Sequence, residues 1–225
     1  DAIKVYDKLE AKIGVTKEVS MQKSRIYQRM NKNEKAVEEL QKLIASDPND
    51  AQSYGMLAEV YQSMGQKDKA LETYNKIIVI DPDNPYIHLS LADYYRNEGD
   101  KERSFSELKK AFSNKNLDSD TKISILSSYY ALLEIHPELR DQAMDLCHLL
   151  VSTHPNEPKA YAVYGDFLDQ DKKTAEAREQ YRIAKSMGSK DFVVYSKLFF
   201  LDTQLQHWDS LKTISDTALT LFPDQ

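Results

Sequence analysis

A repeating sequence period of about 34 residues constrains the fold of this chain more than any other feature. It is most complete between residues 50 and 84, where apolar, small and turn-forming residues stand at fixed intervals: Tyr54, Leu57, Ala58, Tyr61, Gly65, Ala70, Tyr74 and Pro82. Moving back by one period gives Tyr27, Asn31, Ala36, Leu40 and Pro48, and moving forward by one period gives Leu91, Ala92, Tyr95, Gly99 and Leu108. A repeat of this length is typical of a solenoid, in which each unit packs on the next.

Each period predicts a pair of helices. The apolar positions fall at helical spacing in two runs, Leu57, Tyr61 and Met64 followed by Ala70, Tyr74 and Ile77. Gly65 stands between the runs, and glycine readily takes the positive φ that ends a helix. Pro82 follows the second run and cannot continue a helix. The alternative, an ordinary helical bundle with coincidental spacing, does not explain why the pattern recurs.

The pattern Tyr54-x-x-Leu57-Ala58-x-x-Tyr61, with Ala70, Tyr74 and Pro82 further on, resembles the tetratricopeptide repeat (TPR) almost site for site. The resemblance implies an all-α fold, a right-handed α-α superhelix whose first helices line a concave groove. Extending the register over the chain predicts a single TPR solenoid, 1–225, of about six and a half helix-turn-helix repeats. Their approximate ranges are 1–16 (a half repeat), 17–50, 51–84, 85–118, 119–157 (with an insertion near residue 136), 158–191 and 192–225.

Composition narrows the classes of partner. The net charge of −6 disfavours nucleic acid or an anionic membrane as the main partner, because both require a basic surface. No stretch approaches the ~18 consecutive apolar residues of a membrane-spanning helix. Cys147 is the only cysteine, so no intrachain disulfide can form, and its apolar surroundings predict burial. The chain begins at Asp1 without a signal-peptide pattern, which leaves open a processed leader or a longer repeat array.

No catalytic signature is present, so we expect no enzyme activity, no cofactor and no metal site. The sequence lacks the phosphate-binding, dinucleotide-binding, nucleophile-elbow and H-E-x-x-H motifs. Cys147 and His148 are adjacent, but neighbours on a helix point about 100° apart and do not face each other. His136 and His154 have no third ligand at a usable spacing for zinc.

The resemblance also implies where a ligand would bind. Transferring the groove-lining sites of the family gives these candidate peptide-binding residues: Arg25, Gln28, Arg29, Glu59, Gln62, Tyr86, Asp93 and Arg96. Arginine and glutamine suit carboxylates or the backbone of an extended peptide. The alternative is a solvated surface without a high-affinity ligand. The carboxylate clamp of chaperone-adaptor members is not retained, because Met21 and Met56 stand at two of its matching sites.

Two functions fit this fold. The first is a non-enzymatic scaffold that binds a protein or an extended peptide through the concave face. The second is a structural or oligomerisation module of a larger protein, such as a cell-envelope protein, that assembles through solenoid ends or the convex face into a homo- or hetero-oligomer. Seven arginines against 23 lysines, with many Asn, Tyr and Ile, resemble repeat-rich envelope proteins of Gram-negative gut bacteria. This composition suggests a periplasmic or envelope-associated location, with the cytoplasm as the alternative.

Overall fold

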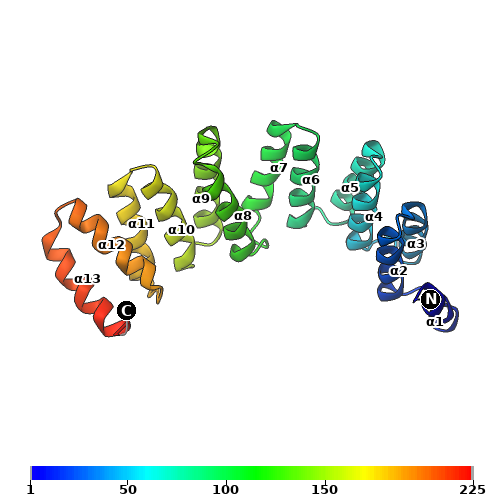
Figure 1. Cartoon of the computed structure of the whole chain (residues 1–225), viewed down its shortest axis with the longest axis horizontal. Coiled ribbons are helices and arrows are strands. Elements are labelled where there is room, and N and C mark those ends of the chain that lie inside the picture. Colours follow the sequence, from blue (N-terminus) through cyan, green and yellow to red (C-terminus); the bar gives the residue numbers. More distant parts are fainter. Residues whose placement is uncertain (1, 224–225) are drawn as a thin grey trace. The chain divides into compact units, whose positions relative to one another are not determined.

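The computed structural model of the chain describes residues 2–223, and every regular element in this range is helical (Figure 1). The first seven helices are α1 (Ala2–Ile13), α2 (Lys17–Arg29), α3 (Asn33–Ser46), α4 (Ala51–Ser63), α5 (Lys67–Ile80), α6 (Pro85–Asn97) and α7 (Lys101–Ser113). The others are α8 (Ser119–Leu132), a 3₁₀ helix η1 (Pro137–Leu139), α9 (Arg140–Thr153), α10 (Pro158–Gln170), α11 (Thr174–Ser186), α12 (Phe192–Gln204) and α13 (Trp208–Leu221). The prediction of an all-α solenoid of helical repeats is confirmed.

A left-handed residue ends the first helix of most pairs. It recurs at the matching place of the turn as Asn31, Gly65, Gly99, Lys172 and Gln206, with φ between 55° and 78°. At Gly65 the next amide, from Gln66, donates to the Tyr61 carbonyl at 2.9 Å, which satisfies an otherwise unpaired carbonyl at the helix end. Such a turn reverses the chain within three residues, 64–66 in this pair, so the next helix packs back against the first.

The connection between α8 and α9 is longer than the others. It runs over seven residues, 133–139, and contains the 3₁₀ helix η1 around Pro137. The additional residues lie where the sequence predicts an insertion, close to His136. The insertion therefore lengthens a turn and leaves α8 and α9 as a packed helix pair.

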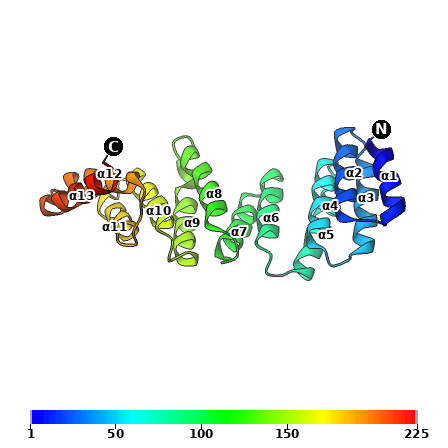
Figure 2. The same cartoon turned by 90° about the horizontal axis from the view of Figure 1, so that it is seen from below.

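The structure falls into two compact units, one within Asp1–Leu108 (unit 1) and the other within Lys109–Gln225 (unit 2). The boundary lies inside α7. In unit 1, α2, α3, α4 and α5 pack in sequence order, as the two views of Figures 1 and 2 show. The prediction of one continuous solenoid over 1–225 stays a prediction.

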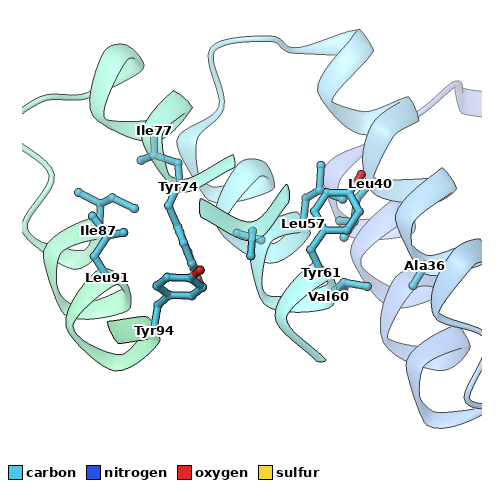
Figure 3. Close-up of a cluster of buried hydrophobic side chains, with 12 residues drawn as sticks. Ala36, Leu40, Leu57, Val60, Tyr61, Tyr74, Ile77, Ile87, Leu91 and Tyr94 are labelled. Atoms are coloured by element: carbon cyan, nitrogen blue, oxygen red, sulfur yellow. The ribbon is translucent and has the colours of Figure 1, made fainter. Parts of the chain in front are cut away.

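The core of unit 1 is a row of apolar side chains that repeats from one helix pair to the next. Ala58 and Ala70 are fully buried, and their small side chains allow α4 and α5 to approach closely. Leu40 and Leu57 continue the core toward α3, as Figure 3 shows. On the other side the Tyr74 ring of α5 packs edge-to-face on Tyr94 of α6, with centroids 6.1 Å apart.

Unit 2 contains a similar core around α10 and α11. Tyr181 of α11 is fully buried, and its hydroxyl donates to Asp166 of α10 at 2.5 Å. Its ring lies over Gly165, where a Cβ atom would come within 2.9 Å of the ring carbons. Gly165 therefore allows close packing of the ring against the backbone of α10.

The last helix pair is packed less closely than α4 and α5. Ile214 is the only residue of α13 that is buried. Phe199 and Leu211 stand where most other pairs carry small residues, and the Phe199 side chain stays 41% exposed. Two bulky side chains at this crossing prevent the close approach that Ala58 and Ala70 permit between α4 and α5.

Each unit also buries one lysine. In unit 1 the Lys23 ammonium of α2 lies 2.9 Å from Asp7 and 2.7 Å from Glu10, both in α1, and 2.9 Å from Glu39 in α3. These contacts hold three helices together through one cation. Burial alone would lower the pKa of Lys23, but the hydrogen bonds and charge of the three carboxylates outweigh it and raise the pKa.

The buried lysine of unit 2 has no carboxylate in contact. Lys122 of α8 donates to the Asn114 carbonyl at 2.9 Å and to the Thr153 hydroxyl at 2.8 Å. Burial lowers its pKa to about 8, although the charges of Asp118 and Glu157 oppose the shift. Lys122 thus joins the loop before α8 to the end of α9 through neutral oxygen atoms.

Candidate functional site

A groove of about 510 Å³ lies on the first helices of three successive pairs in unit 1, namely α2, α4 and α6. Its lining includes Met21, Arg25, Gly55, Met56, Glu59 and Tyr86. The Tyr86 side chain is 54% exposed, and the two methionines are half-buried. The groove therefore combines apolar side chains with two opposite charges, the mixture that a binding site uses for affinity and orientation.

Two of the three groove helices, α2 and α6, begin at a side-chain cap. Asn84 accepts a hydrogen bond from the Tyr86 amide at 3.0 Å, and Pro85 occupies the first turn of α6. Both features favour a helix start, because the first amides of a helix lack intrahelical partners and proline has no amide to satisfy. The cap fixes where Tyr86 leaves the backbone and so fixes its place at the edge of the groove.

Three of the eight residues predicted to bind peptide line this groove: Arg25, Glu59 and Tyr86. The other five do not line it. Gln28 donates to Ser24 at 3.3 Å, Gln62 accepts from Tyr74 at 3.5 Å, Asp93 and Arg96 pair with each other, and Arg29 is exposed one turn beyond Arg25. That these residues bind a peptide stays a prediction.

Gly55 gives the groove its depth. A Cβ atom at Gly55 would meet only the Ile77 Cδ1 atom, at 3.9 Å, which is ordinary contact. Ile77 belongs to α5 and is almost fully buried, yet it forms part of the groove lining. Because Gly55 has no side chain, the inner surface of the groove reaches down to Ile77. Packing within the chain does not require a glycine here.

The sequence pattern contained a signal for this depression that the prediction missed. The positions one period before and one period after Gly55 are Met21 and Leu89, both large and apolar. One missing side chain between two large ones predicts a depression on that face. Met56 also lines the groove and is not among the eight residues predicted to bind peptide, because the sequence comparison shows it only as a mismatch to the carboxylate clamp.

The two charges of the groove affect one another. The protein around Glu59 reduces its hydration and raises its pKa, and the nearby Arg25 cation lowers it in part. The net direction is upward, although the side chain remains accessible to solvent. Glu59 is therefore a carboxylate whose charge is only partly compensated within the groove.

Arg25 and Arg29 differ from the other arginines of the chain. Five arginines form ion pairs with carboxylates of the same chain: Arg96, Arg103, Arg140, Arg178 and Arg182. Within residues 2–223, Arg25 and Arg29 form no such pair, and both side chains are exposed on α2. The α2 wall, by which we mean Arg25 in the groove and Arg29 one turn beyond its lining, has two guanidinium groups that can bind a carboxylate of another molecule.

Unit 2 has a second, smaller groove of about 370 Å³ beside α12. Phe192, Val193 and Phe200 line it with exposed apolar side chains. Its charged residues, Lys197 and Asp169, are paired at 2.7 Å and so neutralise one another. This groove provides apolar surface without an unpaired charge that would select a ligand.

The groups that could carry other chemistry have structural roles. Cys147 is fully buried, and burial raises the pKa of its thiol, which keeps it protonated. The neighbouring His148 lies instead against Tyr164, whose hydroxyl is 2.9 Å from Nε2. Over residues 2–223 no three His, Cys, Asp or Glu side chains gather in an arrangement that could hold a metal ion.

In the same range no helix has both the length and the apolar character to cross a membrane.

Antiparallel helix pairs that pack in sequence order, with a groove on their first helices, define an all-α helical repeat protein of the protein-interaction scaffold class. The sequence model of the family described as tetratricopeptide repeat matches residues 27–94. Residues 27–94 therefore carry tetratricopeptide repeats. No curated protein matches its sequence significantly.

Several solved structures are similar to this chain, and the one with a TM-score above 0.5 has the same fold. The C-terminal part of a TPR repeat-containing protein from Cytophaga hutchinsonii has 16% sequence identity and a TM-score of 0.56, covering 99% of this chain and 90% of that one. YrrB, a TPR protein described as having an unusual peptide-binding site, has 17% identity, a TM-score of 0.48 and coverages of 83% and 93%. PilF of Pseudomonas aeruginosa has 19% identity, a TM-score of 0.47 and 92% coverage of both chains. At such identities the likeness concerns the fold alone.

Proposed function

We propose that the chain is a non-enzymatic binding scaffold that holds an extended peptide segment of a partner protein in the groove of unit 1. The observation that carries this proposal is the groove on α2, α4 and α6, where an exposed Tyr86 and the charges of Arg25 and Glu59 surround an apolar floor. An extended peptide fits such a surface because its side chains can enter the depression while its backbone meets the polar groups. Arg29, one turn beyond Arg25, extends the basic wall.

A peptide-display experiment tests this proposal. Random linear peptides are selected on the purified chain, and their affinities are then measured by fluorescence anisotropy. The comparison variant carries Arg25→Glu and Tyr86→Ala, both on exposed side chains, so we expect its helical content and melting temperature to match the wild type. Peptides that bind the wild type and lose at least about tenfold in affinity for the variant, about 1.4 kcal/mol, would support the groove. Selection of no peptide, or equal affinity for both proteins, would refute it.

Arg25 and Arg96 are both among the residues that the sequence predicts to bind peptide, but Arg96 is paired with Asp93 and does not line the groove. Arg96→Glu is therefore a matched control: it reverses a charge on α6 outside the groove. We expect it to leave the affinity of groove-binding peptides within about twofold.

The second candidate is a structural module that assembles through its end helices. The exposed apolar side chains of α13 favour it, since Trp208 is 63%, Leu219 66% and Leu221 44% exposed. Light scattering across a range of concentrations tests it. A mass that rises with concentration in the wild type and not in Trp208→Ser/Leu219→Ser would support assembly through α13. A strict monomer at all concentrations would count against self-assembly.

A further inference from the structure

The depression at Gly55 has the character of a side-chain pocket. Its base is Ile77, and the groove lining supplies Met21, Met56 and Tyr86 as apolar or aromatic side chains beside the polar Gln52, Asn84 and Ser90. We call this space the Gly55 slot. An apolar side chain placed there would gain burial against Ile77 and the two methionines. Methionine side chains adapt to occupants of different shape, so aliphatic and aromatic side chains of medium size both fit.

The charges beside the slot are not balanced. On the α2 wall Arg25 and Arg29 form no ion pair at contact distance within residues 2–223, and on α6 Asp93 and Arg96 neutralise each other. On α4 Glu59 supplies one carboxylate close to Arg25. The formal charges of Arg25, Arg29 and Glu59 sum to one positive charge. An acidic group of a partner therefore gains more at α2 than a basic group gains at Glu59.

From these observations we propose that the groove binds an extended segment in which an apolar residue, of the size of Leu, Met or Phe, enters the Gly55 slot and a neighbouring Asp or Glu pairs with Arg25. The inference rests on the proposed function, whose ligand class it narrows. Gly55 then determines specificity by leaving the slot open, and Arg25 selects the sign of the adjacent charge. Glu59 competes with the acidic residue of the ligand for Arg25.

Because Glu59 competes with the ligand for Arg25, removing the charge of Arg25 and removing the charge of Glu59 should change the affinity for an acidic peptide in opposite directions. Arg25→Gln removes the cation that binds the ligand carboxylate, so affinity for an acidic peptide falls by about three- to fivefold, the range for a solvent-accessible ion pair. Glu59→Gln removes the competing carboxylate and its repulsion, so the same peptide binds about twofold tighter or more. A basic ligand would respond to both variants in the opposite direction.

Two leucine substitutions test the slot. Gly55→Leu fills it from within, and only Ile77 lies within ordinary contact distance of the new Cβ atom, so the helix pair keeps its packing. We expect at least about a tenfold loss of peptide affinity. Asn75→Leu adds the same side chain to an exposed position of α5 that does not line the groove. Asn75→Leu should leave the peptide affinity unchanged. Circular dichroism of each variant would check that it is folded.

The probes are capped synthetic peptides of about seven residues, which reach roughly 20 Å when extended and so span the groove helices. A positional-scanning set varies each position through the amino acids, with acetylated and amidated ends that remove terminal charges. Binding to the full chain is read by competition fluorescence anisotropy. Enrichment of Leu, Met or Phe next to Asp or Glu, with the variant effects above, would establish the inference.

Other results would overturn it in distinguishable ways. Enrichment of basic or small polar residues, with binding still lost in Tyr86→Ala, would overturn the apolar–acidic ligand and leave the groove function standing. Equal binding to Gly55→Leu and the wild type would overturn the slot. Binding of no peptide set to the wild type would overturn both the inference and the proposed function.

Discussion

Unit 1 and unit 2 share two unusual features and use them in opposite ways. Each has a glycine in the middle of a first helix and a lysine buried in its core. Gly55 of unit 1 leaves space that faces a groove, whereas Gly165 of unit 2 is filled by the Tyr181 ring. Lys23 of unit 1 meets three carboxylates, whereas Lys122 of unit 2 meets none. The same residue type in the same kind of helix thus has a different role according to its neighbours.

The largest effect that would test this comparison is the loss of Lys23. Lys23→Met leaves Glu10 and Glu39 in or near the core without their shared cation, and breaking a buried ion pair costs about 3–5 kcal/mol. We expect a value near the lower end of this range, because Asp7 is half exposed and Lys42 still contacts Glu39. Hydrogen exchange of the α1–α3 amides measures the change within unit 1 alone.

Lys42→Met is the control for that experiment. Lys42 contacts Glu39 at 2.9 Å but is half exposed, and such surface pairs contribute at most about 1 kcal/mol. If Lys23→Met and Lys42→Met lose the same protection from hydrogen exchange, the three carboxylates around Lys23 contribute no more to stability than a surface ion pair does. The proposed difference between Lys23 and Lys122 would then be wrong.

The pH dependence of stability should separate the two lysines. The pKa of Lys122 is about 8 in the folded chain, below its ordinary value of 10.5, so between these pH values the unfolded chain binds more protons. The free energy of unfolding therefore rises with pH across this window, and at about 1.4 kcal/mol per pKa unit the gain over the whole window is about 3 kcal/mol.

The measurement is hydrogen exchange of the α8 and α9 amides at pH 7 and pH 10, corrected for intrinsic exchange rates. Lys122→Met is the reference, because it has the other titrating groups and lacks this one. The wild type should gain stability relative to the variant as pH rises. A parallel pH response in both proteins would show that the buried ammonium does not titrate in this range. The ionisation of Lys23 should not increase stability between pH 7 and pH 10, because the pKa of Lys23 in the folded chain is raised rather than lowered.

Gly165→Ala tests the packed glycine. The new methyl group would lie 2.9 Å from the Tyr181 ring, and the hydroxyl of that ring is held by Asp166, so the ring cannot simply move away. Overpacking of this kind destabilises by about 1–3 kcal/mol. Thermal unfolding followed by circular dichroism would show the loss. An unchanged melting temperature would mean that α10 and α11 can separate without penalty.

Gly55→Ala should have the smallest effect and the opposite sign. Its Cβ atom meets nothing closer than 3.9 Å, and alanine in a helix interior is favoured over glycine by about 0.5–1 kcal/mol. We expect unit 1 to become slightly more stable by the same hydrogen-exchange measurement. A destabilised variant would mean that the backbone of α4 needs glycine for structural reasons, and Gly55 would lose its assignment to the groove.

Much of the fold follows from particular residues of the sequence. Ala58 and Ala70 predict a close helix crossing, and both are fully buried. Gly65 predicts the end of a helix, and it has a positive φ there. These predictions succeed because they depend on local properties, the size of one side chain and the torsion of one backbone residue, which recur once in every period.

The residues of the candidate site were harder to predict from local properties of the sequence. Arg96 matches the pattern of Arg25, but its charge is neutralised by Asp93, three residues earlier on the same helix. Gly55 does not stand out as a functional residue in a sequence, because its role is to leave Ile77 of the next helix accessible. Pairing and accessibility depend on where neighbouring helices place their side chains, which the repeat pattern does not specify.

The sequence by itself determined the helical repeats, since helix periodicity, small residues at crossings and left-handed turns are encoded within each repeat unit. Only the tertiary structure decided which glycine opens a groove, which lysine finds carboxylates and which arginines stay unpaired. The physical reason is that steric filling and electrostatic compensation are properties of groups brought together from different helices. Gly55 and Gly165 are the same residue type, as are Lys23 and Lys122, and folding places different groups beside each of them.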